Sequence, residues 1–310
     1  MLKAFLLIVV GLSGTPEHGE TFHKWGNALA EASETLGVPR DRVAYLVNEK
    51  MEIDTRATGT SRREEIDQVL AAFAKQATAD DVVYVVLIGH GSANGDRPLF
   101  NLPGPDLGPA DFNTMLRRLP TRNVVFVNTS PSSGPWVEEL SAPGRTIITA
   151  TRNAAQQFTT LFGGRFVEAF TSLEADADKN QRISMLEAFV YARDQVKRAF
   201  EQEGLLPTEQ ALLDDNGDKQ GSQEPSPTGD DGRVAATLAL GSIEDAQLPD
   251  DPKLRAVVAE QRELERRVEA LRLLRDSMDP AKYTAELERL VTELALKTRE
   301  RRTLEGSAGR

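Results

Sequence analysis

The sequence contains no cysteine among its 310 residues. Disulfide bonds, cysteine-ligated zinc and a thiol nucleophile are therefore excluded. The absence does not indicate a compartment, because exported proteins can also lack cysteine, so a cytoplasmic and an exported location both stay open. The chain also lacks any apolar run approaching the roughly twenty residues of a membrane-spanning helix. We therefore expect no membrane span.

Basic residues are in the minority: 37 Lys and Arg stand against 48 Asp and Glu, which gives a net charge of −11. Nucleic acids and anionic membrane surfaces bind clustered Lys and Arg, so neither is expected as the main partner. Apolar residues make up 40% of the chain and charged residues 27%, as is typical of a soluble globular protein. The length suffices for one large domain with an appendage, or for two domains.

The short apolar stretch over residues 3–12 has two interpretations. One lysine followed by an apolar core resembles a signal peptide. A stretch that is apolar on both faces and ends in Gly, Ser and Thr also fits a central strand of a parallel sheet. We favour the strand, because no small-x-small cleavage site follows and the fold described next needs a first strand here.

Apolar segments typical of strands alternate with segments of helical periodicity. The strand-like segments are 4–11, 42–48, 82–89, 123–128 and 145–150, and residues 232–240 are expected to return as a last strand. A helix is predicted over 62–76, where Ser61 and Glu64 have the spacing of a capping box. Strands that alternate with helices predict an α/β fold with a mostly parallel, doubly wound sheet.

The composition changes near residue 250. Residues 251–304 are charged, nearly free of glycine, and carry apolar residues three and four positions apart. We therefore predict an α/β domain over residues 1–248 and two helices over 249–310, joined by a turn near 276–280 as an antiparallel helical hairpin or coiled coil. The hairpin either packs on the domain or mediates partner binding, including a homo-oligomer through 251–304.

His90 stands between two glycines, directly after the apolar run 85–88. About forty residues later a second strand-like segment, 124–128, ends in Thr129-Ser130-Pro131-Ser132-Ser133-Gly134. Ligands of open α/β sheets bind beyond the carboxyl ends of the strands, so both motifs are expected at one edge. A nucleophile needs a base within hydrogen-bond reach, and a glycine such as Gly91 lets backbone N–H groups approach a substrate carbonyl.

This two-part pattern resembles the caspase-like fold and, within it, bacterial members of the legumain-like cysteine peptidases. Gly89-His90-Gly91 matches the Gly-His-Gly of that family, and Ser133-Gly134 matches the Ser-Gly that follows the catalytic cysteine by one residue. The resemblance covers roughly residues 4–245 in strand order and motif position, and extends to the segments 100–104, 149–151 and 211–218. It implies a caspase/legumain-like sheet with a cleft that binds peptides.

Pro131 occupies the position of the family's cysteine and has no nucleophilic group. We therefore favour a catalytically inactive homologue, a pseudo-peptidase, that binds peptide or partner protein in the residual cleft. The alternative is an active peptidase or hydrolase in which His90 serves as the base for Ser130 or Ser132, beside Gly91. A hydroxyl is harder to deprotonate than a thiol, and no orienting acid is identifiable. A third interpretation is a scaffold that oligomerises through the C-terminal hairpin.

An EF-hand-like spacing of oxygen ligands lies at 176–187. The candidate calcium ligands are Asp176, Asp178, Asn180, Arg182 and Glu187. Helical periodicity over 158–173 and 184–203 predicts a helix–loop–helix around them. Gln181 stands where the loop favours glycine, and a left-handed turn there costs on the order of 1 kcal/mol. Glu187 also has the spacing of a capping box with Ser184, so a calcium ligand and a helix cap are both open interpretations.

Two further groups are candidates for metal binding. Asp214-x-Asn216-x-Asp218 is a second acidic stretch with alternating oxygen ligands, although Pro225 stands where an EF-hand has its last glutamate. His18 and His23 follow the first strand, and solvated loop histidines are the interpretation we favour for them. Beyond Ca²⁺, no cofactor is expected.

Overall fold

The computed structural model describes residues 3–94, 97–172, 174–180, 182–241, 251–273 and 278–308. The chain divides into two compact units, Met1–Asp245 and Ala246–Arg310. The boundary predicted between residues 248 and 249 falls within 242–250, outside the described residues. None of the described helices combines the length and the apolar character that crossing a lipid bilayer requires.

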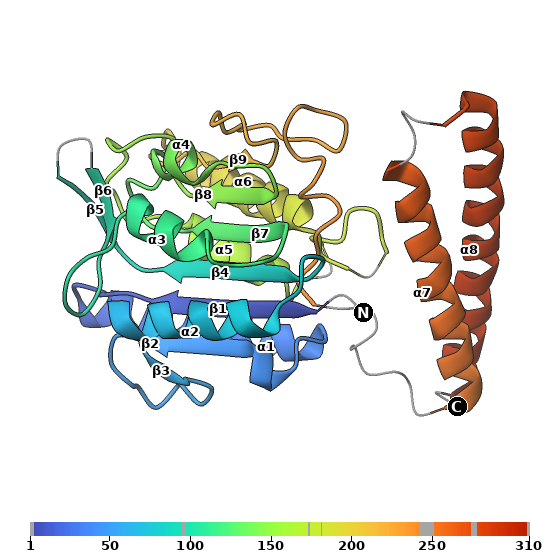
Figure 1. Ribbon diagram of the computed structural model, residues 1–310, viewed down its shortest axis with the longest axis horizontal. Coiled ribbons are helices and arrows are strands. Elements are labelled where there is room, and N and C mark those ends of the chain that lie inside the picture. Colours follow the sequence, from blue (N-terminus) through green and yellow to red (C-terminus); the bar gives the residue numbers. More distant parts are fainter. Residues whose placement is uncertain are drawn as a thin grey trace. The chain divides into compact units, whose positions relative to one another are not determined.

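The first unit is built on a seven-stranded sheet with the strand order β3-β2-β1-β4-β7-β8-β9 (Figure 1). Neighbouring strands are parallel except for the last pair, β8 and β9. The strands are β1 (Ala4–Val10), β2 (Val43–Val47), β3 (Gly59–Thr60), β4 (Val82–Ile88), β7 (Asn123–Asn128), β8 (Arg145–Thr149) and β9 (Leu212–Asp214). The predicted mostly parallel α/β sheet is confirmed, and β1 is the buried interior strand that we favoured for the first apolar stretch.

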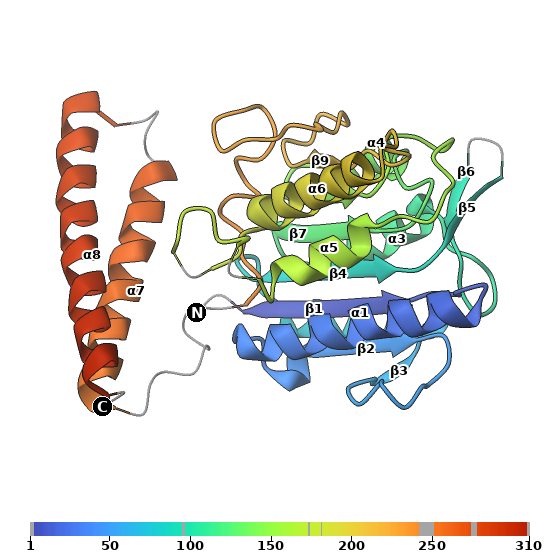
Figure 2. The ribbon, with the colours of Figure 1, turned by 180° about the vertical axis from the view of Figure 1, so that it is seen from behind.

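Helices cover both faces of this sheet (Figures 1 and 2). One face carries α1 (Pro16–Thr35), α5 (Phe162–Ala169) and α6 (Met185–Gln202), and the other carries α2 (Arg63–Gln76), α3 (Pro109–Leu116) and α4 (Trp136–Leu140). Alternate residues of β1 serve the two faces: Leu6 and Ile8 pack in the cluster with α1, and Leu7 and Val9 in the cluster with α2. A parallel strand that is apolar on both sides requires this double cover.

Two short elements complete the first unit. Residues Arg40–Arg42 form the 3-10 helix η1 before β2. Strands β5 (Gly91–Asn94) and β6 (Arg97–Phe100) pair antiparallel as a separate two-stranded ribbon. Because β5 begins directly after His90, this ribbon starts at the carboxyl edge of the large sheet.

The strand predicted over 232–240 is wrong. In this described segment, residues 233–237 form turns, and Ala239 makes an isolated bridge to Ser184. The last strand is instead β9, which follows α6 and pairs with β8. Asp215 accounts for the difference, because its carboxylate accepts hydrogen bonds from the N–H groups of Gly232 at 2.9 Å and Ala235 at 2.7 Å. These two N–H groups are therefore bound by a side chain from another part of the chain and are not available for strand pairing.

Helix α2 occupies the predicted segment, but the capping box predicted for Ser61 and Glu64 is wrong. The Ser61 hydroxyl is buried and has no hydrogen-bond partner among the described residues. Glu65 serves the helix start instead: its carboxylate accepts hydrogen bonds from the N–H group of Thr60 at 2.7 Å and from the Thr60 hydroxyl. The helix is therefore tied to β3 through an acid one position later than predicted.

Helices α5 and α6 flank the EF-hand-like segment as predicted, although α5 is shorter than 158–173. Glu209 fixes its start, because its carboxylate accepts hydrogen bonds from the N–H groups of Leu161 at 2.7 Å and Phe162 at 3.1 Å. The first N–H groups of a helix have no partner within the helix and require such an acceptor. Helix α6 begins with the predicted capping box of Ser184 and Glu187.

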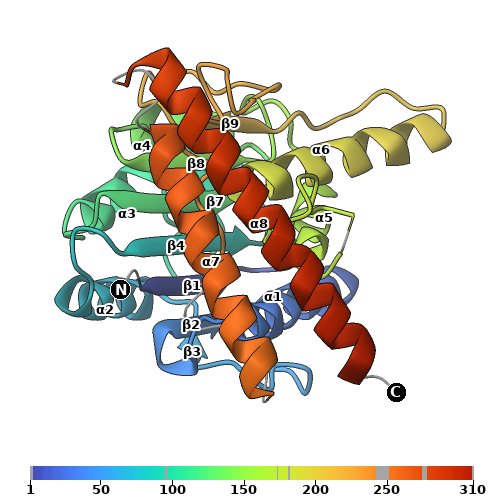
Figure 3. The same cartoon turned by 90° about the vertical axis from the view of Figure 1, so that its right-hand side faces the viewer.

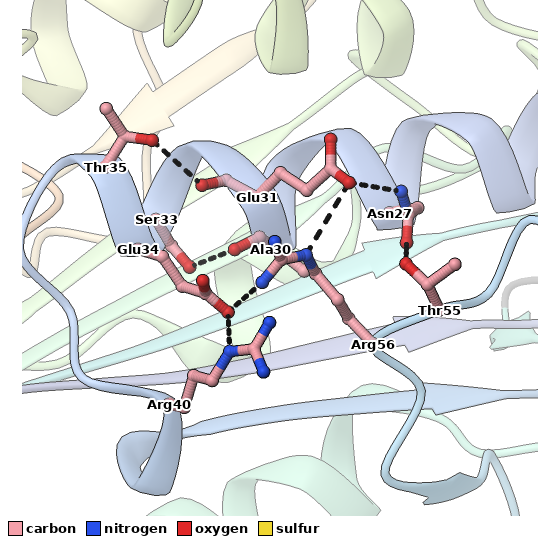
Figure 4. A network of polar contacts seen from close by, with 9 residues as sticks. All are labelled: Asn27, Ala30, Glu31, Ser33, Glu34, Thr35, Arg40, Thr55 and Arg56. Atoms are coloured by element: carbon pink, nitrogen blue, oxygen red, sulfur yellow. Dashed lines mark hydrogen bonds and ion pairs between the residues drawn. The ribbon is translucent and has the colours of Figure 1, made fainter.

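A network of polar contacts fixes the loop between β2 and β3 to helix α1 (Figure 4). The guanidinium of Arg56, on that loop, contacts the Glu34 carboxylate, which also accepts a hydrogen bond from Arg40 Nε at 2.6 Å. The Thr55 hydroxyl donates to Asn27 Oδ1 at 3.3 Å. Contacts from α1 thus hold this loop in place, and η1 supports them through Arg40 near the start of β2.

The second unit contains the helices α7 (Pro252–Leu273) and α8 (Pro280–Ala308), which lie side by side (Figure 3). Their contact is apolar, with the buried residues Leu264, Val268, Leu271 and Leu290. Ion pairs join Arg267 to Glu286 at 3.8 Å and Glu260 to Lys297 at 2.5 Å. The turn predicted near 276–280 falls in part on residues 274–277, outside the described residues, so the antiparallel hairpin stays a prediction.

Candidate functional site

The two sequence motifs meet at the carboxyl edge of the sheet. Strands β4 and β7 are parallel neighbours, and the two motifs follow their ends. The N–H group of Thr129 donates to the Leu87 carbonyl at 3.0 Å, and its hydroxyl donates to the same carbonyl at 2.8 Å. The approach is close, since a Cβ atom on Gly91 would lie 2.6 Å from the Ser130 hydroxyl oxygen. The contact between the motifs therefore requires glycine at position 91.

The imidazole of His90 is half-buried and faces helix α1. Its Nε2 lies 3.3 Å from Nδ1 of His18, and the same Nδ1 lies 3.3 Å from the Thr15 hydroxyl. The His90 ring also meets the Phe22 ring edge-on, with 5.1 Å between the centroids. Burial and the neighbouring His18 lower the pKa of His90, and a hydrogen bond with the backbone of Ser13 acts in the opposite direction. The site thus favours a neutral His90, as a base requires.

The serine hydroxyls on either side of Pro131 are buried and bonded to other acceptors. Ser130 and Ser132 are each only 1% exposed. The Ser130 hydroxyl donates to Asn128 Oδ1 at 2.7 Å, and the Ser132 hydroxyl donates to the Ala154 carbonyl at 3.0 Å. Ser132 also has a φ of 58°, in the left-handed region that a serine rarely adopts. Each hydroxyl proton is therefore directed to an acceptor other than His90.

Ser133 and Gly134 join this loop to the segment that follows β8. The Ser133 hydroxyl accepts hydrogen bonds from the N–H groups of Ala150 at 3.1 Å and Thr151 at 3.3 Å. The N–H group of Gly134 donates to the Thr151 hydroxyl at 3.0 Å. A Cβ atom on Gly134 would collide with the backbone of Arg152. The Ser-Gly pair therefore has a packing role that does not depend on catalysis.

The prediction of solvated loop histidines is wrong, because His18 and His23 both lie on helix α1. Thr15 caps this helix and Pro16 takes its first position, and this Thr-Pro pair is the sequence signal for the helix start. The helix turns His18 toward His90, and His18 is the site residue that the motifs alone do not reveal.

His23 belongs to a buried hydrogen-bond network. Its Nδ1 lies 2.6 Å from Asp54 Oδ2, and its Nε2 lies 2.8 Å from Asn48 Oδ1. The Tyr45 hydroxyl donates to the other oxygen of Asp54 at 2.7 Å. These contacts engage both ring nitrogens of His23 and tie helix α1 to the loop after β2.

Exposed apolar side chains surround the site loops. Leu12 follows β1, and Phe158 and Leu161 follow β8; all three are exposed, Phe158 by 70%. The Thr160 hydroxyl donates to the Thr129 carbonyl at 2.5 Å and so holds the loop after β8 against the second motif.

A cavity of about 310 Å³ opens beside the end of β8. Its lining includes Ala150, Phe162, Arg193, Lys197, Glu209 and Gln210. Burial raises the pKa of Glu209 to about 7, against the lowering effect of the hydrogen bonds that it accepts at the start of α5. The cavity therefore contains a carboxyl group that is partly protonated at neutral pH.

Three carboxylates of the EF-hand-like segment converge. One oxygen from each of Asp176, Asp178 and Glu187 lies within 4.8 Å of the others. The N–H group of Asn180 donates to Asp176 Oδ1 at 3.0 Å, and that of Arg182 donates to Asn180 Oδ1 at 2.7 Å, so the loop folds around its own side chains. This donor set is entirely oxygen, which suits a hard cation such as Ca²⁺.

Glu187 already has other hydrogen bonds. One oxygen accepts from the N–H group of Ala177 at 3.0 Å, and the other accepts from the N–H group and the hydroxyl of Ser184 at 2.9 and 2.7 Å. Bidentate ligation of a cation would compete with these bonds. Gln181, the position where glycine is expected, lies outside the described residues.

No family model matches the sequence, and no curated protein matches it. The resemblance to caspase/legumain-like peptidases therefore rests on the two motifs and on the order of the strands that carry them.

Proposed function

We propose that the protein is a catalytically inactive homologue of the caspase/legumain-like peptidases that binds extended peptide segments, free or within a partner protein, at the carboxyl edge of its sheet. The proposal is based on the contacts of the loop around Pro131. The position of the nucleophile has no reactive group, and the hydroxyls of Ser130 and Ser132 are buried and donate elsewhere. Without an attacking atom beside His90, acyl transfer has no first step.

The same edge retains groups that suit peptide binding. His90 and Gly91 are partly exposed, and the β5–β6 ribbon begins at this point. Leu12 and Phe158 provide exposed apolar contacts on loops to either side. Extended peptides are bound by backbone hydrogen bonds together with contacts for alternate side chains. The β5–β6 ribbon and these side chains are the groups that would make the two kinds of interaction.

Binding is tested with a fluorescein-labelled library of short extended peptides and fluorescence anisotropy. We expect Leu12→Ser and Phe158→Ser to weaken binding by roughly tenfold, because each removes an apolar contact. Val234→Ser is the matched control, because it also removes an exposed apolar side chain, but on a different segment. Val234 precedes Ala235, whose carbonyl accepts a hydrogen bond from the start of α6. Equal peptide affinity in all three variants would contradict a peptide site at this edge. No binding by the unmodified protein would contradict the peptide-binding function itself.

An active hydrolase is the second candidate, and the position of Ser130 beside Gly91 favours it. The Ser130 hydroxyl would have to turn from Asn128 to His90 before it could lose its proton. Cleavage of an Asn- or Asp-directed peptide library that disappears in His90→Ala would establish this candidate. Cleavage that persists in His90→Ala would point to a contaminating peptidase.

A calcium-binding role for the EF-hand-like segment is favoured by the convergence of Asp176, Asp178 and Glu187. We expect weak affinity, because Glu187 would have to give up hydrogen bonds to the loop and to the helix cap. The measurement is the rise in melting temperature on addition of CaCl₂, compared between the unmodified protein, Glu187→Gln and the exposed control Glu203→Gln. An equal rise in all three would remove this site.

A scaffold that assembles through α7 and α8 is supported by Val291 and Leu296, which are exposed apolar residues of α8. A homo-oligomer through 251–304 would cover them. Light scattering of the full chain and of residues 1–245 gives the mass of each particle, and an unchanged oligomeric state would exclude this role.

A further inference from the structure

Three buried aspartates lie near the end of β9, two of them consecutive in the chain and the third joined to them by a hydrogen bond. Asp214 is 0% exposed, and Asp215 and Asp231 are 5% and 6% exposed. The N–H group of Asp215 donates to Asp231 Oδ1 at 3.2 Å, which brings the two segments together. An ionised carboxylate loses several kcal/mol of hydration when it is buried, unless hydrogen bonds or an opposite charge compensate. Each of these groups therefore needs a partner for its charge.

Hydrogen bonds compensate the buried charge of Asp215, but they leave one oxygen of Asp214 without a partner among the described residues. Both oxygens of Asp215 accept backbone N–H groups, from Gly232 and Ala235. Oδ1 of Asp214 accepts the N–H group of Gly217 at 3.0 Å. Its Oδ2 is buried and has no hydrogen-bond partner among the described residues. Buried polar atoms without partners are rare in folded proteins and often mark an ion or a water.

Negative charge accumulates around this atom. Burial raises the pKa of Asp231 to about 6; the hydrogen bond from Asp215 lowers it, and the charges of Asp214, Asp215 and Asp218 raise it further. The charge of Asp214 thus opposes ionisation of Asp231. A cation between them would turn this repulsion into attraction.

A cavity of about 390 Å³ opens beside the cluster, and Asp215 is the member of the cluster that lines it. Its lining includes Asp215, Asn216, Asp218, Gly229, Asp230 and Arg233. The cavity leaves room for a hydrated cation, and the side chains at 214, 216 and 218 provide the alternating oxygen ligands that Ca²⁺ prefers. Water molecules can supply the rest of the six to eight ligands that this ion takes.

The cluster lies away from the edge that carries His90. Because β9 is antiparallel to β8, Leu212 pairs with Thr149, the last residue of β8, Asp214 pairs with Ile147 in the middle, and the chain then continues toward the start of β8. The N–H group of Lys219 donates to the Ser141 hydroxyl at 3.0 Å, which places this loop beside the segment that precedes β8. The cluster is thus at the amino edge of the parallel strands.

We propose that a Ca²⁺ ion binds between Asp214 and Asp231, with the unpartnered Asp214 Oδ2 as a direct ligand. The ion would compensate the buried charge and fix the loop from Asp214 to Asp231. Asp215, the residue after Asp214, holds the turn at 232–235 through its carboxylate. This site differs from the EF-hand-like segment in its burial and in its residues, and it does not depend on peptide binding.

The experiment uses the full chain with the Glu187→Gln substitution, so that the EF-hand-like segment does not contribute. EDTA-treated protein is titrated with CaCl₂, and with MgCl₂ for comparison, by isothermal calorimetry and by melting temperature. We expect one bound Ca²⁺ per chain and a melting temperature that rises with calcium concentration. Adding Asp214→Asn should weaken calcium binding by roughly tenfold or more, because an amide is a poorer ligand than a carboxylate.

Asp230→Asn is the matched control, since Asp230 is exposed, adjoins Asp231 and lines the same cavity. It should keep the affinity within about twofold. If Asp214→Asn does not fold, Asp231→Asn takes its place. No calcium binding in the Glu187→Gln protein, or full binding in the Asp214 and Asp231 variants, overturns the proposal.

Discussion

The contact between the two motifs is tested by Gly91→Ala. The added Cβ atom would lie 2.6 Å from the Ser130 hydroxyl oxygen and closer still to the carbonyl oxygen of Pro131. A carbon and an oxygen normally approach to about 3.3 Å, so the loop must retreat by more than half an ångström. The loop resists this movement, because the N–H group of Ser132 donates to the Gln156 carbonyl at 2.9 Å.

Overpacking of this kind destabilises a folded protein by about 1–3 kcal/mol. The assay is urea unfolding followed by circular dichroism, and the expected result is a lower midpoint with an unchanged slope. Gly108→Ala is the control, because its Cβ would meet its nearest neighbour, Leu99, at 3.4 Å. It should lose less than about 1 kcal/mol, the range for changes at a helix N-cap. If both variants unfold at the midpoint of the unmodified protein, the two motifs are not packed as described.

Two further variants test the packing around the site. Burial raises the pKa of Glu209 from 4.5 to about 7, so its contribution to stability is complete below about pH 4.5 and is lost as the pH rises through 7. The expected loss in the free energy of unfolding is about 3 kcal/mol. Urea unfolding at about pH 5 and pH 8 should show this loss in the unmodified protein and not in Glu209→Gln. The same change of unfolding free energy with pH in both proteins would refute the prediction. Ser184→Ala removes the cap of α6 and should cost about 1 kcal/mol, measured as a lower melting temperature; an unchanged value would show that Glu187 caps the helix alone.

The strands that carry the site could be predicted from the sequence, because each is buried on both faces. β1, β4 and β7 are continuous apolar runs bounded by glycine or polar residues, and no helical pattern competes with them. A parallel arrangement then places the ends of these strands at one edge. This rule predicts that Gly91 and Ser130 lie close together, and the structure confirms it.

Predictions failed where a distant side chain decides the local structure. Residues 232–240 have the apolar content of a strand, but the carboxylate of Asp215 binds the N–H groups of Gly232 and Ala235 and holds a turn. Helix α5 starts late because Glu209, far along the chain, provides its first acceptors. Local sequence patterns contain no information on such partners.

The chemistry of the site also depends on contacts that the motifs do not encode. His90 meets His18 because helix α1 packs over the end of β4, and the sequence shows only two histidines far apart. The hydroxyls of Ser130 and Ser132 looked equally available beside Pro131. Their burial and their acceptors, Asn128 and Ala154, emerge only from the packed loops.

Peptide binding without cleavage at this edge can be tested by mass spectrometry. An Asn- and Asp-containing peptide library is incubated for a long time with the unmodified protein and with His90→Ala. We expect the peptides to stay intact in both samples. Cleavage products that form with the unmodified protein and are absent with His90→Ala would contradict it and assign catalysis to His90.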